Sequence, residues 1–222
     1  MMSFIARVLF ILALACGSAQ AAMPKDGKLV FDIIRDGDVI GRHTFRFNRV
    51  GDRVDVAIDI AIKVKVLLLT VFDYEHSNHE TWEHGELVRL TTRTDDNGDD
   101  LKVDGKLTPA GFEVDTAKGE QTLKEPVMPT SYWRTDTIKA RRMLNTQTGE
   151  VMNVSVSPGE KTRIVARGKE IDAMHYVMSG DLQLELWYDM DNVLVGLQFK
   201  GGDGSTIHYS LRAPSQTTAR TD

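Results

Sequence analysis

The clearest alternation of apolar with charged or small residues spans positions 53–66, and it constrains the fold more than any other feature. Every second position holds a β-branched apolar residue, and aspartate, lysine or alanine stands between them. Successive side chains of a β-strand point to opposite faces, so this pattern predicts one long strand with a dry face and a wet face. At about 3.3 Å per residue the strand would run roughly 45 Å, well beyond the usual length. The dry face would carry Val54, Val56, Ile58, Ile60, Ile62, Val64 and Val66.

The same period of two recurs through most of the chain, at 39–47, 182–188, 193–199 and 207–211. Pairs that tolerate positive φ separate such segments, which is typical of tight hairpins. The pairs are Asp36-Gly37, Asn97-Gly98, Asp104-Gly105 and Asp203-Gly204. Strands joined by short links are antiparallel neighbours. The sequence therefore predicts an all-β fold, a large coiled antiparallel meander that forms an open or closed up-and-down barrel.

One segment interrupts the strand pattern and predicts a short helical plug. Pro126 and Pro129 break the sheet, and Thr135 stands where a helix N-cap is favourable, ahead of residues 136–144. The turn-forming residues 145–149 would end this helix, which we expect to cover one opening of the barrel. We expect a single domain over residues 22–213, followed by a flexible polar tail at 214–222.

The first 21 residues are typical of a secretory signal peptide. Arg7 precedes a short apolar run, and the segment closes on Ala19-Gln20-Ala21. We expect cleavage after Ala21 and a periplasmic or secreted protein with no transmembrane span, because the run is shorter than the roughly 20 residues needed. Alternatively, this segment is a lipoprotein signal, and a lipid attached to Cys16 anchors the protein to a membrane. With a net charge of −5 and no basic run, the chain is not expected to bind nucleic acid.

A histidine-rich stretch looks at first like a metal site. His79 and His84 are five residues apart, whereas a zinc protease helix needs a spacing of four. On a strand, His76, Glu80 and His84 could share a face but would lie too far apart to bind one metal ion. We therefore expect a wet strand face here, with no metal and no cofactor. The acidic residues 95–100 are interpreted as a solvated hairpin turn rather than a calcium loop.

Aromatic side chains are the better candidates for ligand binding, because each of them combines an apolar body with a polar tip. They flank strand ends or the helical break, and the simpler interpretation is that they pack the barrel ends. His43 shares a face with Phe45 and Phe47, and either forms a hydrogen bond in the core or reaches a ligand. The candidates from this set are His43, Trp82, Tyr132, Trp133, Trp187 and Tyr188.

Several strings resemble a family of exported bacterial proteins that is catalogued only as a domain of unknown function and is akin to a larger exported family of the same status. The most specific is Leu144-Asn145-Thr146-Gln147-Thr148-Gly149, which adds Asn145 and Gln147 to the ligand-binding candidates. The resemblance implies a β-rich exported protein and assigns no catalytic residue. The other strings are residues 82–87, 131–133, 186–189, 194–195 and 203–205.

Two functions from different classes remain open at this stage. A dry barrel closed by a plug could hold an apolar, lipid-like ligand at its mouth, as a binding protein of the envelope. Alternatively the interior is solid, and the protein serves as a structural component or binds an envelope protein partner. A hydrolase using His76, Glu80 or His84 is the least favoured hypothesis.

Overall fold

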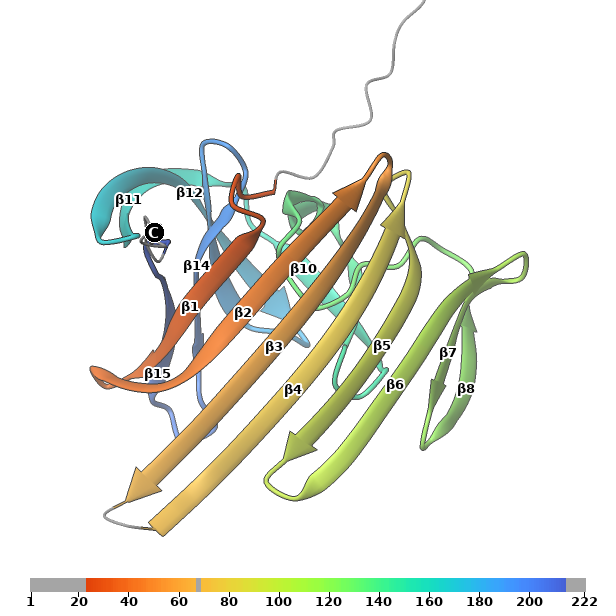
Figure 1. Ribbon diagram of the computed structural model, residues 1–222, viewed down its shortest axis with the longest axis horizontal. Helices are drawn as coiled ribbons and strands as arrows, with labels where there is room; N and C mark the ends of the chain where they lie inside the picture. Colours follow the sequence, from red (N-terminus) through yellow and green to blue (C-terminus); the bar gives the residue numbers. More distant parts are fainter. Residues whose placement is uncertain (1–22, 67–68, 215–222) are drawn as a thin grey trace, which may run out of the picture.

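A single antiparallel sheet makes up most of the structure, a computed structural model that describes residues 23–66 and 69–214 (Figure 1). It has fifteen strands. In chain order these are β1 (Lys28–Arg35), β2 (Asp38–Val50), β3 (Arg53–Val66), β4 (Leu69–Glu83), β5 (Glu86–Asp96), β6 (Asp99–Thr108), β7 (Gly111–Thr116), β8 (Gly119–Leu123), β9 (Arg142–Leu144), β10 (Val151–Val156), β11 (Glu160–Ala166), β12 (Lys169–Gly180), β13 (Leu184–Asp189), β14 (Leu194–Lys200) and β15 (Thr206–Leu211). The predicted signal peptide, Cys16 and residues 215–222 of the predicted tail lie outside the described residues.

The strands lie in the sheet nearly in chain order, as a meander requires. The order runs from β8 back to β1, continues through β15, β14, β13 and β12, and ends with β10 and β9, while β11 pairs with β12. The two halves curl toward each other around an interior (Figure 1). The hydrogen-bonded ladder is not closed. Side chains bridge its edges instead: Gln121 Nε2 donates to the Gly149 carbonyl at 2.6 Å, and Lys118 pairs with Glu150 at 2.8 Å. The predicted all-β barrel-like fold is confirmed, in its open form.

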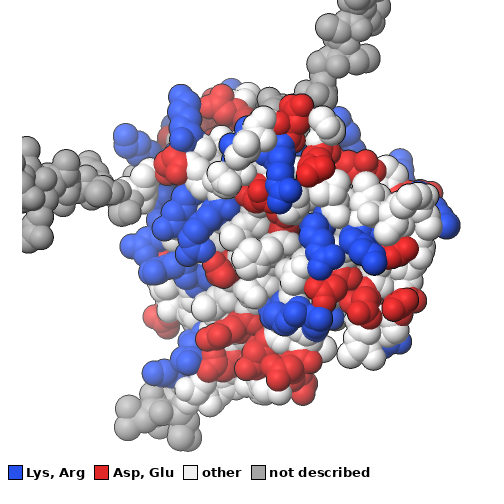
Figure 2. Space-filling model, turned by 45° about the vertical axis from the view of Figure 1, so that its right-hand side comes forward, with Lys and Arg blue, Asp and Glu red and all other residues white. Residues whose placement is uncertain are grey.

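The long strand predicted over residues 53–66 is confirmed with the same bounds, as β3. Val54, Val56 and Ile58 are buried on its inner face. The outer face carries cross-strand ion pairs, such as Lys63 with Asp73 at 2.9 Å. Figure 2 shows the same tendency on one face of the molecule, where basic and acidic side chains stand in neighbouring groups. Strict alternation thus separates a dry side from a wet side, as expected.

One predicted turn is wrong. Asp104-Gly105 does not reverse the chain but lies within β6, opposite Asp115 and Val114 of β7. A Cβ atom built on Gly105 would lie 2.4 Å from the ring of Phe112, so the glycine makes room for an aromatic ring that packs across the strand. Tertiary packing here overrides the turn propensity of the dipeptide.

The predicted helical plug is confirmed as a 3-10 turn, but the longer helix over 135–144 is wrong. Helix η1 spans only Thr135–Lys139, and its N-cap residue is Arg134, which makes no side-chain cap hydrogen bond. Residues 142–144 form β9 instead, because they pair with residues 151–153 of β10. Among the described residues, no helix has the length and apolar character needed to cross a membrane.

The hairpin of β11 and β12 folds over the outer face of the C-terminal strands. The backbone N–H of Arg167, at its tip, donates to the Leu211 carbonyl at 2.7 Å. A Cβ atom on Gly196 of β14 would meet the Ile164 side chain at 2.6 Å. Consequently the five consecutive residues 193–197 are all buried, across a register shift in the pairing of β13 with β14. The predicted single dry face at 193–199 is therefore corrected to a strand that is covered on both sides.

Candidate functional site

The inner face of β4 carries a row of polar and aromatic side chains, here called the inner polar row: Tyr74, His76, Asn78, Glu80 and Trp82. His76 and Glu80 are only 5% and 1% exposed. The predicted wet strand face is therefore wrong for both residues. The intervening residues point outward, so the histidine-rich string is divided between two environments by the period of the strand.

Glu80 is the centre of this row. Its Oε2 atom accepts the indole N–H groups of Trp82 and Trp133, both at 2.9 Å, and its Oε1 atom accepts from Asn78 Nδ2 at 3.0 Å. Burying a carboxylate is costly unless hydrogen bonds replace its hydration, and three donors do so here. The two indole rings meet edge to face, with centroids 5.9 Å apart. Glu80 thus fixes the positions of both tryptophans.

Residues 124–150, here called the inner segment, bring Trp133 to Glu80. Tyr188 of β13 fastens this segment from the other side, because its hydroxyl donates to the Tyr132 carbonyl at 2.7 Å. Burial raises the pKa of Tyr188, so the hydroxyl remains a donor. Arg134, which follows Trp133, is 6% exposed, and its guanidinium carbon lies 4.4 Å from the Trp82 ring centroid. Sheet and inner segment are therefore joined by a buried stack of cation on indole.

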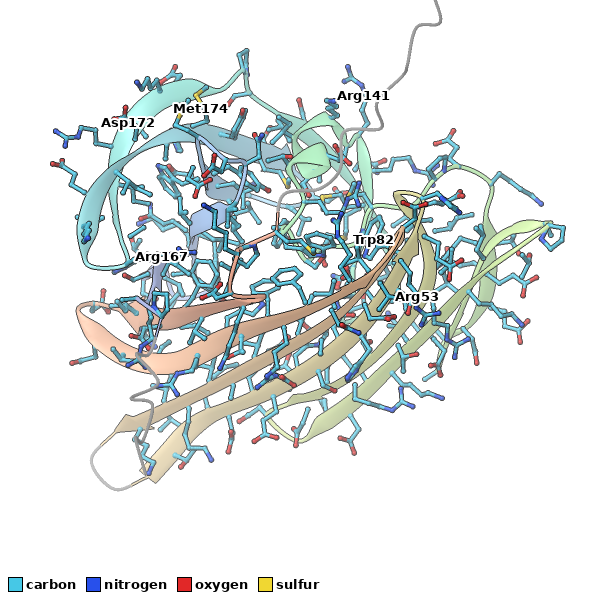
Figure 3. The ribbon with its side chains drawn as sticks, turned by 45° about the horizontal axis from the view of Figure 1, so that its top comes forward. Arg53, Trp82, Arg141, Arg167, Asp172 and Met174 are labelled. Carbon is cyan, nitrogen blue, oxygen red and sulfur yellow. The ribbon has the colours of Figure 1, made fainter. Side chains whose placement is uncertain are left out.

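A pocket of about 480 Å³, here called the mouth pocket, opens beside this stack. It is lined by residues 84–87 of the β4–β5 turn and by residues 125–128 and 140–142 of the inner segment, together with Trp82, Arg134 and Asp136. Figure 3 labels Trp82 at the end of β4 and Arg141 on the segment near it. The volume falls within the range of about 300–1,000 Å³ typical of small-molecule sites.

The lining combines an apolar wall with three arginines and with the carboxyl groups of Glu86, Glu125 and Asp136. Leu87, Val127 and Met128 supply the wall. Arg134 forms an ion pair with Asp136, yet its Nε atom is buried without a hydrogen-bond partner among the described residues. Two further arginines, Arg141 and Arg142, are exposed and line the same pocket. Arg142 Nη1 lies 3.8 Å from Glu125 Oε2, and Arg141 has no ion pair among the described residues. Such a site can accommodate an acidic group together with an apolar body.

The candidate His43 lies elsewhere in the interior, stacked on Phe45 with ring centroids 4.2 Å apart. Burial, and secondarily the nearby His76, lowers its pKa to about 3. The expected core hydrogen bond is not formed by its Nε2 atom, which is buried without a partner in the described part of the chain. His76 forms a hydrogen bond with Thr94 Oγ1 at 2.8 Å, and burial lowers its pKa to about 4. Both rings are therefore neutral at pH 7.

Gln147 fastens the inner segment to the sheet, and Asn145 shapes the turn that presents it. Asn145 Oδ1 accepts the backbone N–H of Gln147 at 2.9 Å and closes the local turn. Gln147 donates from Nε2 to Asp96 at 3.0 Å and accepts from the Tyr74 hydroxyl at 3.3 Å. Neither candidate lines the mouth pocket, so the structure places both in scaffolding positions.

Trp187 lies apart from the other candidates. It stacks on His175 with centroids 4.6 Å apart, and His175 Nε2 is 2.7 Å from Glu185 Oε2. Of the eight predicted residues, the structure therefore brings together Trp82, Tyr132, Trp133 and Tyr188, and places Trp82 in the pocket lining.

Sequence reasoning missed the three arginines of the mouth pocket. Arg134 directly follows Tyr132-Trp133 in the sequence. An arginine beside a tryptophan is the only sequence signal here that could have suggested a guanidinium group stacked on an indole ring. Arg141 and Arg142 carried no such indication, because their approach to β4 depends on the path of the whole inner segment.

A protein-family model described as "Domain of unknown function (DUF6134)" matches residues 31–212. The chain belongs to this family. The match spans nearly the whole described sheet and all residues that line the mouth pocket. The resemblance seen in the sequence is thereby confirmed for a β-rich family without an assigned function.

The DUF6134 chain also resembles a solved structure, described as a beta-barrel-like protein of domain of unknown function DUF1849 from Brucella abortus. The two share 12% sequence identity with a TM-score of 0.57, over 84% of this chain and 95% of the other. At this identity the likeness shows the fold alone. Among curated proteins, none matches this chain significantly.

Proposed function

We propose that this DUF6134 protein is an exported binding protein that holds an amphiphilic acid in its mouth pocket, with the acidic group at the arginines and the apolar part against Leu87, Val127 and Met128. The observation that carries this proposal is the buried guanidinium of Arg134, stacked on Trp82, with its Nε atom unpartnered among the described residues. Buried donors normally have partners, so a free one beside a pocket favours a bound acceptor.

The pocket lining supports an amphiphile more than a purely apolar lipid. A fatty acid has a carboxylate for Arg141 or Arg142 and a chain for the apolar wall. Arginine binds carboxylates through two parallel hydrogen bonds, which a neutral headgroup cannot reproduce. The proposal therefore places the ligand at the mouth of the barrel and makes its headgroup charge decisive.

Laurate titration, followed by tryptophan fluorescence, tests the proposal. The chain has three tryptophans, and Trp187→Phe leaves only the two that meet at Glu80. In this background we expect a saturable fluorescence change with laurate and a much weaker one with dodecyl maltoside, which has the same chain length and no charge. Equal responses to both would contradict the headgroup assignment.

Matched substitutions then locate the site. Arg141→Gln should weaken laurate binding by about fivefold or more, as expected for a lost charge-assisted hydrogen bond. Lys139→Gln provides the control, because Lys139 is an exposed cation of the same segment that does not line the mouth pocket. If both variants bind like the parent, the ligand does not occupy this pocket.

A filled interior favours the second candidate function, a structural or partner-binding envelope protein. Val54, Val56 and Ile58 are each at most 7% exposed, and they line neither the mouth pocket nor three further pockets of the described residues. This part of the inner face of β3 is thus covered by the protein's own side chains, whereas Ile60 on the same face lines a pocket together with His76. Failure of laurate and of other acidic amphiphiles to bind would leave this candidate as the better account.

A further inference from the structure

A second pocket lies at the other end of the molecule, where the tip of the β11–β12 hairpin meets β1 and β15. Its volume is about 550 Å³, and it is lined by four cationic side chains: Lys28, Arg42, Arg167 and Arg212. Figure 3 shows Arg167 at the left of the structure, well separated from Trp82. We call this site the basic pocket, and it shares no residue with the mouth pocket.

Backbone hydrogen bonds hold these cations together although they come from distant parts of the chain. The Arg167 N–H donates to the Leu211 carbonyl at 2.7 Å, and the Arg212 N–H donates to the Val30 carbonyl at 2.8 Å. Within the sheet, Arg42 of β2 is opposite Asp32 of β1. The hairpin, β15, β1 and β2 thus supply a fixed frame for the pocket.

The charges in this frame are not balanced. Arg42 Nε and Arg212 Nη1 lie 3.9 and 3.5 Å from the same atom, Asp32 Oδ1, so one carboxylate is shared by two guanidinium groups. Asp26 is the only other acidic residue at the pocket within the described residues. Neither Lys28 nor Arg167 has an ion-pair partner among them. An excess of positive charge remains, on a protein whose net charge is −5.

The backbone at Arg167 adopts a conformation that is unfavourable for arginine, with φ at 55°. Four turns place a non-glycine residue and the following glycine both at positive φ: Asp36-Gly37, His84-Gly85, Asn97-Gly98 and Arg167-Gly168. Aspartate, asparagine and histidine adopt this conformation more readily than other residues with a side chain, whereas arginine is disfavoured there. Strained residues of this kind cluster at functional sites. Arg167 is the one disfavoured residue among these four turns, and it lines the basic pocket.

We propose that the basic pocket binds a phosphate group. Arginine forks match phosphate oxygens through paired hydrogen bonds, and lysine adds a mobile point charge. Three arginines and one lysine suit a ligand group that carries more than one negative charge. A phosphate group can carry two charges, whereas a carboxylate carries only one. The phosphate can belong to a soluble compound or to a lipid headgroup, since both present the same oxygens.

Calorimetric titration with pyrophosphate at low ionic strength tests this proposal on the purified protein. Arg167→Asn keeps a residue that tolerates positive φ, and Arg212→Gln removes a second cation. Arg163→Gln is the matched control, because Arg163 is an exposed arginine of the same hairpin, paired with Glu170 at 2.9 Å and outside the pocket. Circular dichroism verifies folding, and Arg212→Gln decides the outcome if Arg167→Asn does not fold.

We expect saturable pyrophosphate binding by the wild type. Each pocket variant should weaken it by about fivefold or more, and the Arg163 control should change it less than about twofold. Added salt should weaken binding, since the partners are exposed ions. No saturable binding of pyrophosphate or of phosphatidylglycerol vesicles, or an equal loss in the control, would overturn the proposal.

Vesicle sedimentation identifies the source of the phosphate. Binding to phosphatidylglycerol vesicles but not to phosphatidylcholine vesicles, with displacement by pyrophosphate, assigns a lipid headgroup to the pocket. Pyrophosphate binding without vesicle binding assigns a soluble phosphate compound. Both results support the site, and neither depends on the occupant of the mouth pocket.

Discussion

Strands β3 and β4 lie side by side and face the same interior, yet their inner faces have opposite chemistry. Val56 pairs with Glu80, Ile58 with Asn78 and Ile60 with His76, so an apolar stripe runs beside the inner polar row. The apolar stripe only needs to exclude water. The polar row must find specific partners, and two of its members, Tyr74 and Glu80, find them in the inner segment, which also supplies Arg134 to the mouth pocket. The comparison shows that one strand stabilises the barrel while its neighbour positions the candidate site.

Acid should have the largest effect on stability, because the apolar stripe of β3 is flanked by two buried histidines, His43 of β2 and His76 of β4. Burial lowers the pKa of His76 to about 4 and that of His43 to about 3, whereas the unfolded values are near 6.5. As the pH falls below 6.5 the unfolded state takes up protons first. The free energy of unfolding is therefore highest above pH 6.5 and decreases as the pH falls toward 4. The loss should approach about 1.4 kcal/mol per pH unit for each histidine.

Urea denaturation between pH 7.5 and pH 5 measures this effect. His43→Phe removes one of the two titrating rings from an aromatic surrounding and should flatten the pH dependence. His79→Gln changes an exposed histidine on the outer face of β4 and should leave the dependence unchanged. A wild-type stability that is flat across this range would show that the two rings are not held neutral by burial.

Truncation of the apolar stripe should have the next largest effect. Ile58→Ala leaves a cavity among fully buried side chains and should lower the free energy of unfolding by about 3 kcal/mol. Ala61→Ser, at an exposed position on the outer face of the same strand, should change it by less than about 0.5 kcal/mol. Similar effects of both substitutions, measured by chemical denaturation, would contradict the division of β3 into a dry and a wet face.

The polar row is probed by Glu80→Gln, which keeps the shape of the side chain. An amide replaces one acceptor oxygen by a donor, which must then face Asn78 Nδ2 or the two indole N–H groups. We expect a loss of about 2 kcal/mol in the free energy of unfolding. Glu75→Gln, on the exposed face of β4, is the control. An unchanged stability of Glu80→Gln would mean that Glu80 does not organise the tryptophans.

The smallest effect is expected from Tyr188→Phe. The substitution removes one hydroxyl and leaves the Tyr132 carbonyl without its donor, at a cost of about 1 kcal/mol. Tyr176→Phe on the neighbouring strand β12 provides the comparison, because its hydroxyl has no hydrogen bond among the described residues. Thermal unfolding should separate the two variants by a few degrees.

The bounds of β3 could be predicted from the sequence because alternation is a local property that each residue reports. The burial of Glu80 could not, because its donor Trp133 is 53 positions away and a charged residue on a strand normally indicates solvent. For the same reason the arginines of the mouth pocket escaped prediction. Gly105 had the turn chemistry expected of a hairpin, but the ring of Phe112 decided its conformation.

Crystallisation of the protein with laurate tests the central claim most directly, that the inner polar row and the inner segment build a ligand site at the barrel mouth. The account predicts electron density in the mouth pocket, with the carboxylate about 2.7–2.9 Å from nitrogen atoms of Arg134, Arg141 or Arg142. An empty mouth pocket at saturating laurate, or a chain bound along the stripe of Val54 and Ile58, would contradict it.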